Sequence, residues 1–172
     1  VAIVGGGATG VELAAELMEG HHALMHGLPS DQRFPVDVTV VEALPRLLPP
    51  LPEPLAAKAR RALEALGVTV MTDAKVERVD ASGLDTSQGR VEAELIVWAA
   101  GVAPVAVQGE PGLNLDGKGR IIVDDRLRTS APEVWALGDC AAAPGPDGEP
   151  VPARAQAASQ QAAWLAQAFR DA

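Results

Sequence analysis

The sequence predicts an α/β fold, in which strands and helices alternate around a parallel sheet, and three observations support this class. An apolar run at residues 1–4 leads into a glycine-rich turn and then into a long amphipathic stretch. Two further apolar runs, at residues 36–42 and 68–71, flank a second amphipathic stretch. Strand, helix, strand, helix, strand is the βαβαβ order of parallel sheets with right-handed crossovers.

The first helix is expected at residues 9–25, because acidic and apolar residues separate onto two faces. Glu12 and Glu19 fall on one face, while Ala14 and Met18 fall on the other. The small apolar residues would allow this helix to approach a sheet closely.

The second helix is expected to begin at Pro54 and to end at Gly67. Proline is tolerated in the first helical turn, where its missing N–H would have no helical partner. Glycine commonly follows the last helical residue in a left-handed conformation. Residues 45–54, which precede this helix, are rich in proline and are therefore expected to be irregular.

Short antiparallel strands are expected over residues 75–92, after the third parallel strand. The pairs Ser82-Gly83 and Gln88-Gly89 mark the turns between them. Residues 94–99 are expected to rejoin the parallel sheet as a buried strand.

A domain boundary is expected near Ala103, where the alternation of strands and helices gives way to a loop-like segment. Residues 1–103 would form the first domain, and residues 104–172 would form part of a second. The second part is expected to hold two strands and a final helix, at residues 119–124, 134–137 and 153–169. Two strands are too few to form a stable sheet, so this part would need a partner sheet.

The composition excludes several classes of function. A length of 172 residues suggests one domain or little more. The net charge of −9 would repel the phosphates of nucleic acid and the headgroups of anionic lipid, so neither is an expected partner. The single cysteine, Cys140, allows no internal disulfide and no Cys-x-x-Cys dithiol, and is expected to be a small buried residue. His22 and His26 lie at i and i+4 without a third ligand, so no metal site is expected.

The beginning of the sequence favours a truncated piece of a longer protein. Val1 is not an initiator methionine, and it lies inside an apolar run. No apolar run approaches the roughly 20 residues that a membrane span needs. The cysteine content fits a reducing compartment such as the cytoplasm.

The glycine-rich turn matches the G-x-G-x-x-G pattern of Rossmann-type dinucleotide-binding domains. Gly5, Gly7 and Gly10 occupy the glycine positions, with Ala8 and Thr9 between the last two. The first glycine permits the tight turn, the second lets the backbone approach a pyrophosphate, and the third lets the helix pack against the strand. The helix N-terminus supplies free N–H groups for the phosphates. A glycine-rich turn that binds nothing is the alternative, which the flanking strand and helix disfavour.

Glu42, at the end of the second strand, is the candidate for contact with the adenosine ribose. A carboxylate here accepts hydrogen bonds from the ribose hydroxyls and repels a 2′-phosphate, which predicts NADH over NADPH. The gap from Gly10 is longer than the usual ~20 residues, and an extension over residues 20–35 accounts for the excess. The alternative is an exposed acid at the end of a strand.

Five segments together resemble type II (non-proton-pumping) NADH:quinone oxidoreductases, which belong to the pyridine nucleotide-disulfide oxidoreductase superfamily of flavoproteins. The segments are VAIVGGGATGVELAAEL, VVEALPRLLP, VWAAGV, LGDCA and AQAASQ, and the resemblance covers essentially the whole chain. The glycine motif and the Gly-Asp pair are shared across the superfamily. The Ala-Gln-x-Ala-x-Gln run is more specific to the quinone-reducing family.

The resemblance implies NADH and FAD as cofactors and a quinone as electron acceptor. The NADH domain would be inserted into an FAD domain, in which Asp139 of the Gly138-Asp139 pair would bind the ribityl hydroxyls of FAD. Ala155 and Gln156 would lie beside the isoalloxazine, and Gln156 and Gln160 would border the quinone channel.

In the NADH domain, the resemblance places Glu12 near the nicotinamide and Gly101 where the nicotinamide ribose approaches closely. Ala8 replaces a proline that the family often has. Ordinary alternatives stay open. Glu12 could favour a helix N-terminus by its charge, Asp139 could be a turn residue, and the two glutamines could form a polar helix face.

The chain departs from the family in two respects. It is expected to lack the N-terminal FAD-binding half and the C-terminal region that attaches the family to the membrane. The parent protein is expected in the cytoplasm, peripheral on the inner face of the cell membrane, and the resemblance is compatible with a homodimer.

Two other functions remain open. The chain could be a stand-alone, non-catalytic dinucleotide-binding module. It could also belong to another FAD-dependent NAD(P)H reductase of the superfamily, with an iron–sulfur protein or sulfide as partner. Among the acceptors, the Ala-Gln-x-Ala-x-Gln run favours quinone, and the lack of a paired redox cysteine disfavours sulfide and disulfide chemistry.

Overall fold

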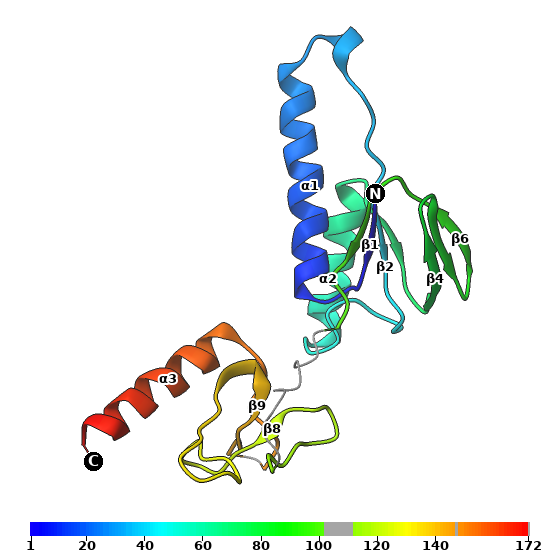
Figure 1. The fold of residues 1–172 in the computed structure, drawn as a ribbon. Helices are drawn as coiled ribbons and strands as arrows, with labels where there is room; N and C mark the ends of the chain where they lie inside the picture. Colours follow the sequence, from blue (N-terminus) through cyan, green and yellow to red (C-terminus); the bar gives the residue numbers. More distant parts are fainter. Residues whose placement is uncertain (102–111, 147, 172) are drawn as a thin grey trace. The chain divides into compact units, whose positions relative to one another are not determined.

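The computed structural model describes residues 1–101, 112–146 and 148–171, and these form two compact units (Figure 1). The units are Val1–Gly101 and Val102–Ala172. The expected boundary at Ala103 lies outside the described residues. Two buried apolar clusters lie within the first unit and one lies within the second.

The first unit is built on a parallel sheet with the strand order β3-β2-β1-β7. Its strands are β1 (Ala2–Val4), β2 (Thr39–Val41), β3 (Thr69–Met71) and β7 (Ile96–Trp98). The helices α1 (Ala8–Gly27) and α2 (Glu53–Ala65) connect the first three strands. The predicted α/β class and βαβαβ order are therefore confirmed.

Alternation along the strands gives the sheet two apolar faces. On one face, Ile3 and Val40 pack in a cluster with Ala14 and Met18 of α1 and Leu63 of α2. On the other face, Ala2, Val4 and Val41 join a second cluster with residues from the antiparallel strands. Figure 1 shows the helices on one side of the sheet and those strands on the other.

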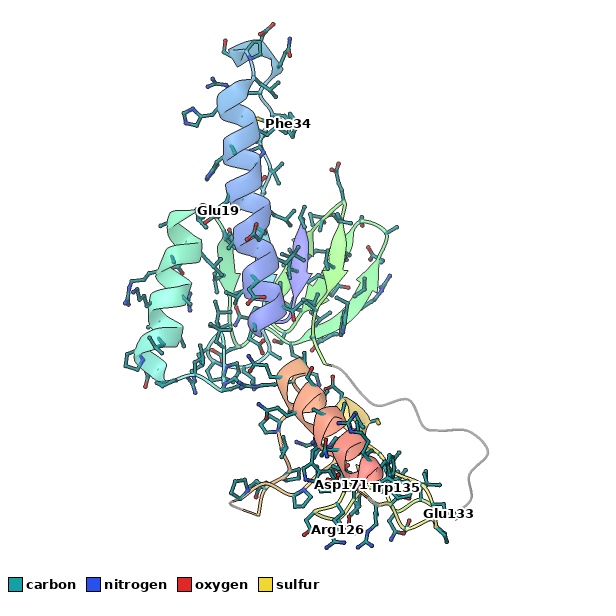
Figure 2. All side chains as sticks on the ribbon, turned by 90° about the vertical axis from the view of Figure 1, so that its left-hand side faces the viewer. Glu19, Phe34, Arg126, Glu133, Trp135 and Asp171 are labelled. Atoms are coloured by element: carbon teal, nitrogen blue, oxygen red, sulfur yellow. The ribbon has the colours of Figure 1, made fainter. Side chains whose placement is uncertain are left out.

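The helix α1 presents the two faces that the sequence predicts. Gly10, Ala14 and Met18 are its buried residues, while Glu12 and Glu19 are exposed. The helix runs beyond its predicted end to Gly27. The segment that returns from it brings Phe34 back against α1, where the ring centroids of Phe34 and His21 lie 5.7 Å apart (Figure 2).

The helix α2 begins one residue before the predicted start, with Pro54 in its first turn. Gly67 follows its end with a φ of +91°, as expected for a glycine that terminates a helix.

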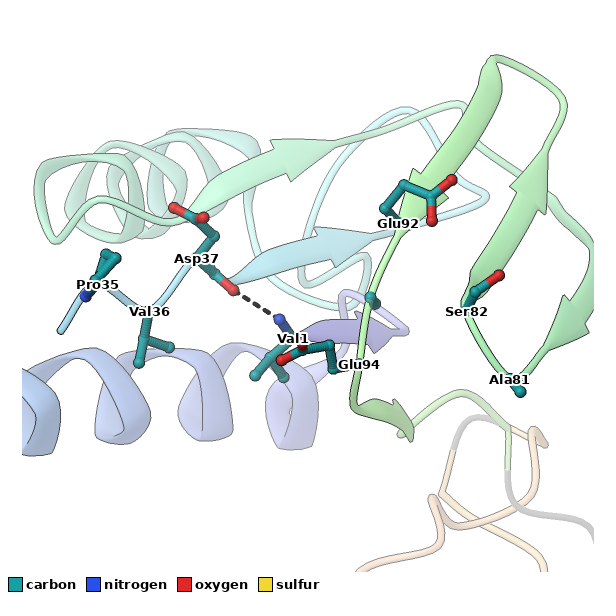
Figure 3. Close-up of a pocket in the computed structure, with 9 residues that line it drawn as sticks. Val1, Pro35, Val36, Asp37, Ala81, Ser82, Glu92 and Glu94 are labelled. Atoms are coloured by element: carbon teal, nitrogen blue, oxygen red, sulfur yellow. Dashed lines mark hydrogen bonds between the residues drawn. The ribbon is translucent and has the colours of Figure 1, made fainter.

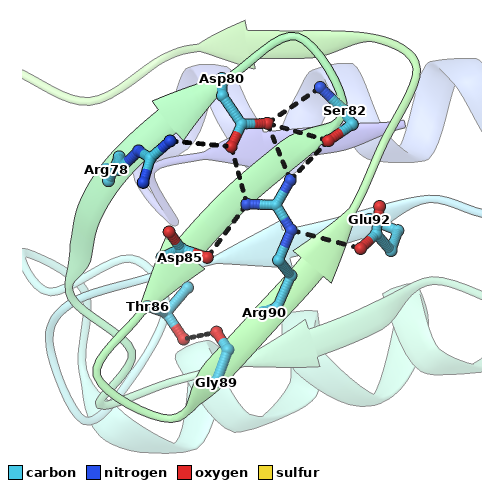
Figure 4. A network of polar contacts seen from close by, with 8 residues as sticks. All are labelled: Arg78, Asp80, Ser82, Asp85, Thr86, Gly89, Arg90 and Glu92. Carbon is cyan, nitrogen blue, oxygen red and sulfur yellow. Dashed lines mark hydrogen bonds and ion pairs between the residues drawn. The ribbon is translucent and has the colours of Figure 1, made fainter.

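The predicted antiparallel strands are β4 (Val76–Asp80), β5 (Gly83–Thr86) and β6 (Gly89–Glu92). An exposed polar network holds them together around the Arg90 guanidinium (Figure 4). Arg90 donates to both carboxylate oxygens of Asp80, at 2.7 and 3.0 Å, and to Asp85 at 3.0 Å. These bonds, together with the backbone N–H of Ser82, hold the pKa of Asp80 well below its usual value.

This network predicts a measurable dependence of stability on pH. Because the pKa of folded Asp80 is depressed, its charged form stabilises the fold above about pH 4, the ordinary value of an aspartate, and that stabilisation is lost as the pH falls through the folded pKa. In the wild type, the midpoint of urea denaturation should fall between about pH 4 and pH 2. We expect this fall to be smaller in Arg90→Gln, because the pKa of Asp80 is less depressed without Arg90. Arg78→Gln is the control, because the Arg78 guanidinium is largely exposed and lies 3.7 Å from Asp80. Equal acid sensitivity in the Arg90 variant and the wild type would contradict the assignment.

The second unit contains a short parallel pair and a long helix. The strands are β8 (Ile121–Ile122) and β9 (Ala141–Ala142), and the helix is α3 (Ala155–Arg170). Two turns are capped by aspartates. Asp116 accepts from the backbone N–H groups of Lys118 and Arg120, and Asp124 does the same for Arg126 and Arg128.

The prediction of a strand at residues 134–137 is wrong. This segment makes one isolated bridge, between Trp135 and Arg128, and the second strand of the unit lies instead at Ala141–Ala142. Leu127, just before Arg128, and Glu133, two residues before Trp135, both have a positive φ. Their left-handed conformations interrupt the extended backbone that a regular strand needs. The Trp135 ring instead packs edge-on against Phe169 of α3, with centroids 4.9 Å apart.

Within the described part of the chain, no helix combines the length and the apolar character of a membrane span.

Candidate dinucleotide-binding site

The glycine turn lies at the carboxyl edge of the parallel sheet, between the ends of two neighbouring strands. Val4 pairs with Val41 of β2 and with Trp98 of β7, so the residues that follow all three strands emerge side by side. The carboxyl edge is where open parallel sheets bind ligands.

The three motif glycines have different surroundings. Gly5 adopts a φ of +113°, and a side chain there would meet the backbone of Ala99 and Ala100. A Cβ on Gly10 would collide with the Gly5 carbonyl, so this glycine allows α1 to cross close to the turn. Gly7 has no atom within 4 Å of its Cβ position. The turn is therefore open on the side of Gly7, where a pyrophosphate would approach.

The N-terminus of α1 directly follows this open glycine. Gly7 is the N-cap and has no side chain to bond the first helical N–H groups. Ala8 and Thr9 are exposed in the first turn. Donors that lack helical partners thus face the same opening, together with the positive end of the helix dipole.

Glu42 is buried rather than exposed, and its carboxylate bonds to the protein itself. It follows β2 directly and is 9% exposed. Its Oε2 accepts the Gly6 N–H at 2.6 Å, and its Oε1 accepts the Leu44 N–H at 2.8 Å. The alternative of an exposed acid at the end of a strand is therefore wrong, and the predicted contact with the adenosine ribose stays a prediction. A carboxylate has about four acceptor positions, so two bonds leave capacity for hydroxyl donors.

The other two predicted residues of this unit are exposed. Glu12 lies in the second turn of α1 and makes no ion pair with any described residue. Gly101 has a φ of +70° and no atom within 4 Å of its Cβ position. The sequence reasoning did not single out Trp98, whose exposed indole N–H donates to the Ala100 carbonyl at 2.7 Å, next to Gly101.

A hollow of about 550 Å³ lies away from this edge, at the amino ends of the strands (Figure 3). Val1 and Asp37 line it together with Glu94, and the Val1 amino group donates to the Asp37 carbonyl at 2.7 Å. The glycine turn, rather than this hollow, carries the chemistry expected of a dinucleotide site.

In the second unit, the Gly138-Asp139 pair forms a turn against α3. The turn is a short 3₁₀ helix (Gly138–Cys140) that follows Leu137. Gly138 has a φ of +72°, and its Cβ position lies 3.4 Å from the Ala158 side chain. Asp139 is exposed at the turn, and its carboxylate has no partner among the described residues. Cys140, expected to be buried, is exposed because it closes the same surface turn.

The side chain that ties this turn to the helix is Gln161. Its Oε1 accepts the Gly138 N–H at 2.7 Å. Gln161 was not among the predicted site residues, since it follows the Ala-Gln-x-Ala-x-Gln run by one position. Nothing in the sequence alone marks it, because only the fold shows that Ala158, one helical turn before it, lies against Gly138.

The contact predicts a defined effect of Gln161→Leu. This variant keeps much of the volume but leaves the Gly138 N–H without its acceptor, which costs about 1–3 kcal/mol for a buried donor and less for this half-buried one. We expect a lower thermal midpoint and weaker flavin retention by the complete protein. Gln156→Leu is the matched control for stability, because Gln156 is exposed and makes no bond to the described residues. Equal midpoints for the two variants would show that the contact is unimportant.

The other predicted residues of this unit lie along the exposed part of α3. Ala155 is its first residue, and Gln156 and Gln160 are exposed one turn apart. Gln160 also borders a hollow of about 260 Å³ with Trp164 and Leu127. In the part of the chain that is described, no group of three or more histidine, cysteine or acidic residues is arranged to hold a metal ion.

The comparison with known families decides the assignment. The model of the family described as "Pyridine nucleotide-disulphide oxidoreductase" matches residues 1–162. The chain belongs to the pyridine nucleotide-disulphide oxidoreductase family. The glycine turn and the Gly138-Asp139 turn are therefore placed in a family of flavin-dependent NAD(P)H oxidoreductases.

Within the pyridine nucleotide-disulphide oxidoreductases, two relatives confirm the predicted resemblance. The chain is 42% identical to a type II NADH:quinone oxidoreductase of Haemophilus influenzae, over 94% of this chain and 37% of that protein. It is 35% identical to one of Mycobacterium tuberculosis, over 94% of this chain and 36% of that protein. The chain thus spans little more than a third of the length of these relatives.

A solved structure shows the same fold in this family. An FAD-dependent pyridine nucleotide-disulphide oxidoreductase from Desulfovibrio vulgaris superposes with a TM-score of 0.80 at 32% identity, over 99% of this chain and 42% of that chain. The α/β class with its antiparallel strands is thereby confirmed as that of the pyridine nucleotide-disulphide oxidoreductases.

Proposed function

We propose that this chain is part of a flavoenzyme that transfers a hydride from NADH to FAD and passes the electrons on to a quinone. The observation that carries the proposal is the glycine turn, with Gly7 open and the N-terminus of α1 directly behind it. The 42% identity to a quinone-reducing relative supports the choice of acceptor.

Residues 1–103 are proposed as the NADH-binding domain. The turn at Gly5, Gly7 and Gly10, with Ala8 and Thr9, would hold the pyrophosphate. Glu42 would accept hydrogen bonds from the adenosine ribose and disfavour a 2′-phosphate, which makes NADH the preferred substrate. Gly101 would allow the nicotinamide ribose to approach closely, and Glu12 would lie near the nicotinamide.

Residues 104–172 are proposed as a portion of the FAD domain. Asp139, which is exposed and unbonded among the described residues, is free to accept the ribityl hydroxyls of a flavin. Ala155 and Gln156 would lie beside the flavin ring, and Gln156 and Gln160 would border the quinone site. A bound flavin would supply the redox chemistry, and the residues of this chain would orient the nicotinamide toward it and exclude water.

The proposal also has consequences for the cellular location and the oligomeric state of the complete protein. NADH is supplied by the cytoplasm and quinones reside in the membrane, so the complete protein is proposed to work as a peripheral protein on the inner face of the cell membrane. A homodimer is compatible with this arrangement.

Steady-state oxidation of NADH by the complete protein tests the proposed acceptor. A short-chain quinone, a ferredoxin and a disulfide are offered in parallel. We expect turnover with the quinone to exceed that with the other two by at least about tenfold, a difference of 1.4 kcal/mol in activation free energy. Faster turnover with ferredoxin or disulfide would instead assign another reductase of the family, and no turnover with any acceptor would favour a binding module.

A further inference from the structure

The loop between β2 and α2 bonds both backbone polar groups of Gly6, the central residue of the glycine turn. The Gly6 N–H donates to Glu42 Oε2 at 2.6 Å, and the Gly6 carbonyl accepts the Leu48 N–H at 2.8 Å. Both partners come from the segment that follows β2. The position of the turn is therefore set by this loop as well as by β1 and α1.

Gly6 is also packed tightly against side chains of this loop. A Cβ on Gly6 would meet the Leu47 side chain and the Cβ and Cγ of Glu42, and Leu47 is 1% exposed. Gly6 is the variable position of the G-x-G-x-x-G pattern, so the phosphate-binding motif does not demand a glycine here. In this chain, the side chains of Leu47 and Glu42 leave no room for a Cβ at position 6.

Leu48 reaches the Gly6 carbonyl from a strained backbone conformation. Its φ is +49°, in the left-handed region that leucine rarely adopts. Such a conformation persists only when the surroundings over-determine it. The Leu51 N–H donates to the Leu48 carbonyl at 2.9 Å, so the next turn of the loop holds this residue in place.

Arg46 supplies the bonds that close the loop on itself. Its Nη1 donates to the Leu51 carbonyl at 2.7 Å, and its Nη2 donates to the Pro49 carbonyl at 2.6 Å. Pro49, Pro50 and Pro52 have no N–H, so the loop has few backbone donors with which to fold. The planar fork of an arginine suits two carbonyls at fixed spacing, whereas a lysine offers a single point charge.

We propose that the loop over residues 42–52 is a clamp on the glycine turn, and that Arg46 is the positioning residue that keeps the clamp closed. Arg46 acts through Leu48 and Gly6, since both of its terminal nitrogens are committed to the loop. Closing the clamp in advance removes an ordering cost from dinucleotide binding, and so raises affinity. The inference rests on the proposed binding of NADH at the glycine turn.

The test compares three variants by NADH titration and by amide hydrogen exchange. Arg46→Met removes the fork and keeps the length of the side chain. Arg46→Lys keeps the charge and can satisfy one carbonyl. Arg61→Met is the control for lost positive charge, because Arg61 is exposed on α2 and has no partner among the described residues. The titration uses the whole chain, and the complete flavin-loaded protein supplies KM and kcat.

We expect Arg46→Met to weaken NADH binding by about tenfold, the effect of losing a clamp fixed by two charge-assisted hydrogen bonds. Arg46→Lys should fall between Arg46→Met and the wild type, and Arg61→Met should bind as the wild type does. The amides of Gly6 and Leu48 should exchange faster in Arg46→Met, while that of Val41, in the sheet, should not. In the complete protein, KM for NADH should rise with little change in kcat.

Two results would overturn the inference: unchanged NADH affinity in Arg46→Met, or weakened affinity with unchanged exchange at Gly6 and Leu48. A wild-type chain that binds no NADH would count against the proposed function instead. The exchange of the Gly6 and Leu48 amides would still decide, in that case, whether Arg46 closes the clamp.

Discussion

Gly10→Ala is expected to destabilise the chain by roughly 1–3 kcal/mol, although alanine is the better helix former by about 1 kcal/mol. The reason is local, because the added Cβ would collide with the Gly5 carbonyl. That oxygen belongs to the backbone of the glycine turn and cannot rotate away as a side chain could. Either α1 or the turn must shift, so we also expect NADH affinity to fall more than tenfold.

Gly20→Ala provides a control on the same helix. Gly20 is an exposed residue of α1 with no atom within 4 Å of its Cβ position. Alanine should therefore stabilise the chain there by about 0.5–1 kcal/mol. Opposite signs for the two substitutions, measured by urea denaturation, would locate the effect in the helix–turn contact. A stabilising Gly10→Ala would contradict the predicted close approach.

Glu42→Gln is expected to weaken NADH binding by about tenfold to a hundredfold. The carboxylate accepts the N–H groups of Gly6 and Leu44, whereas an amide oxygen can replace only one of its two oxygens. The amide NH2 would face the other N–H, and an unsatisfied buried donor costs about 1–3 kcal/mol. Glu19→Gln, on the exposed face of α1, controls for the loss of one negative charge. Calorimetric titration with NADH and NADPH measures both variants.

The burial of Glu42 also changes what Glu42→Arg should do. A role at the ribose alone would predict a shift of preference from NADH to NADPH. Arginine accepts no hydrogen bond and would leave the Gly6 and Leu44 N–H groups unpaired. We therefore expect weaker binding of both nucleotides. A gain in NADPH affinity would show that the glycine turn does not depend on the bonds from Glu42.

The sequence was sufficient to predict the parts of the fold that depend on local patterns. The period of the apolar residues located α1, and Gly67 marked the end of α2. The prediction of a strand at residues 134–137 failed because a short apolar run does not reveal that Leu127 and Glu133 adopt left-handed conformations.

The predicted site residues were those with a motif to identify them, such as Gly10 and Asp139. Residues that act through another residue carried no such signal. Among the described residues, Arg46 bonds only to carbonyls of its own loop, and Gln161 bonds to the N–H of Gly138. Partners of this kind depend on which segments the fold brings together, and the sequence alone does not state that.

One measurement addresses the proposed function most directly: the visible absorption of the complete protein, recorded before and after anaerobic addition of NADH. We predict an oxidised flavin band that bleaches within the mixing time when NADH is added, and that bleaches far less with an equal concentration of NADPH. A flavin band that NADH leaves unchanged, or a protein that binds no flavin, would contradict the assignment of this chain to an NADH-oxidising flavoenzyme.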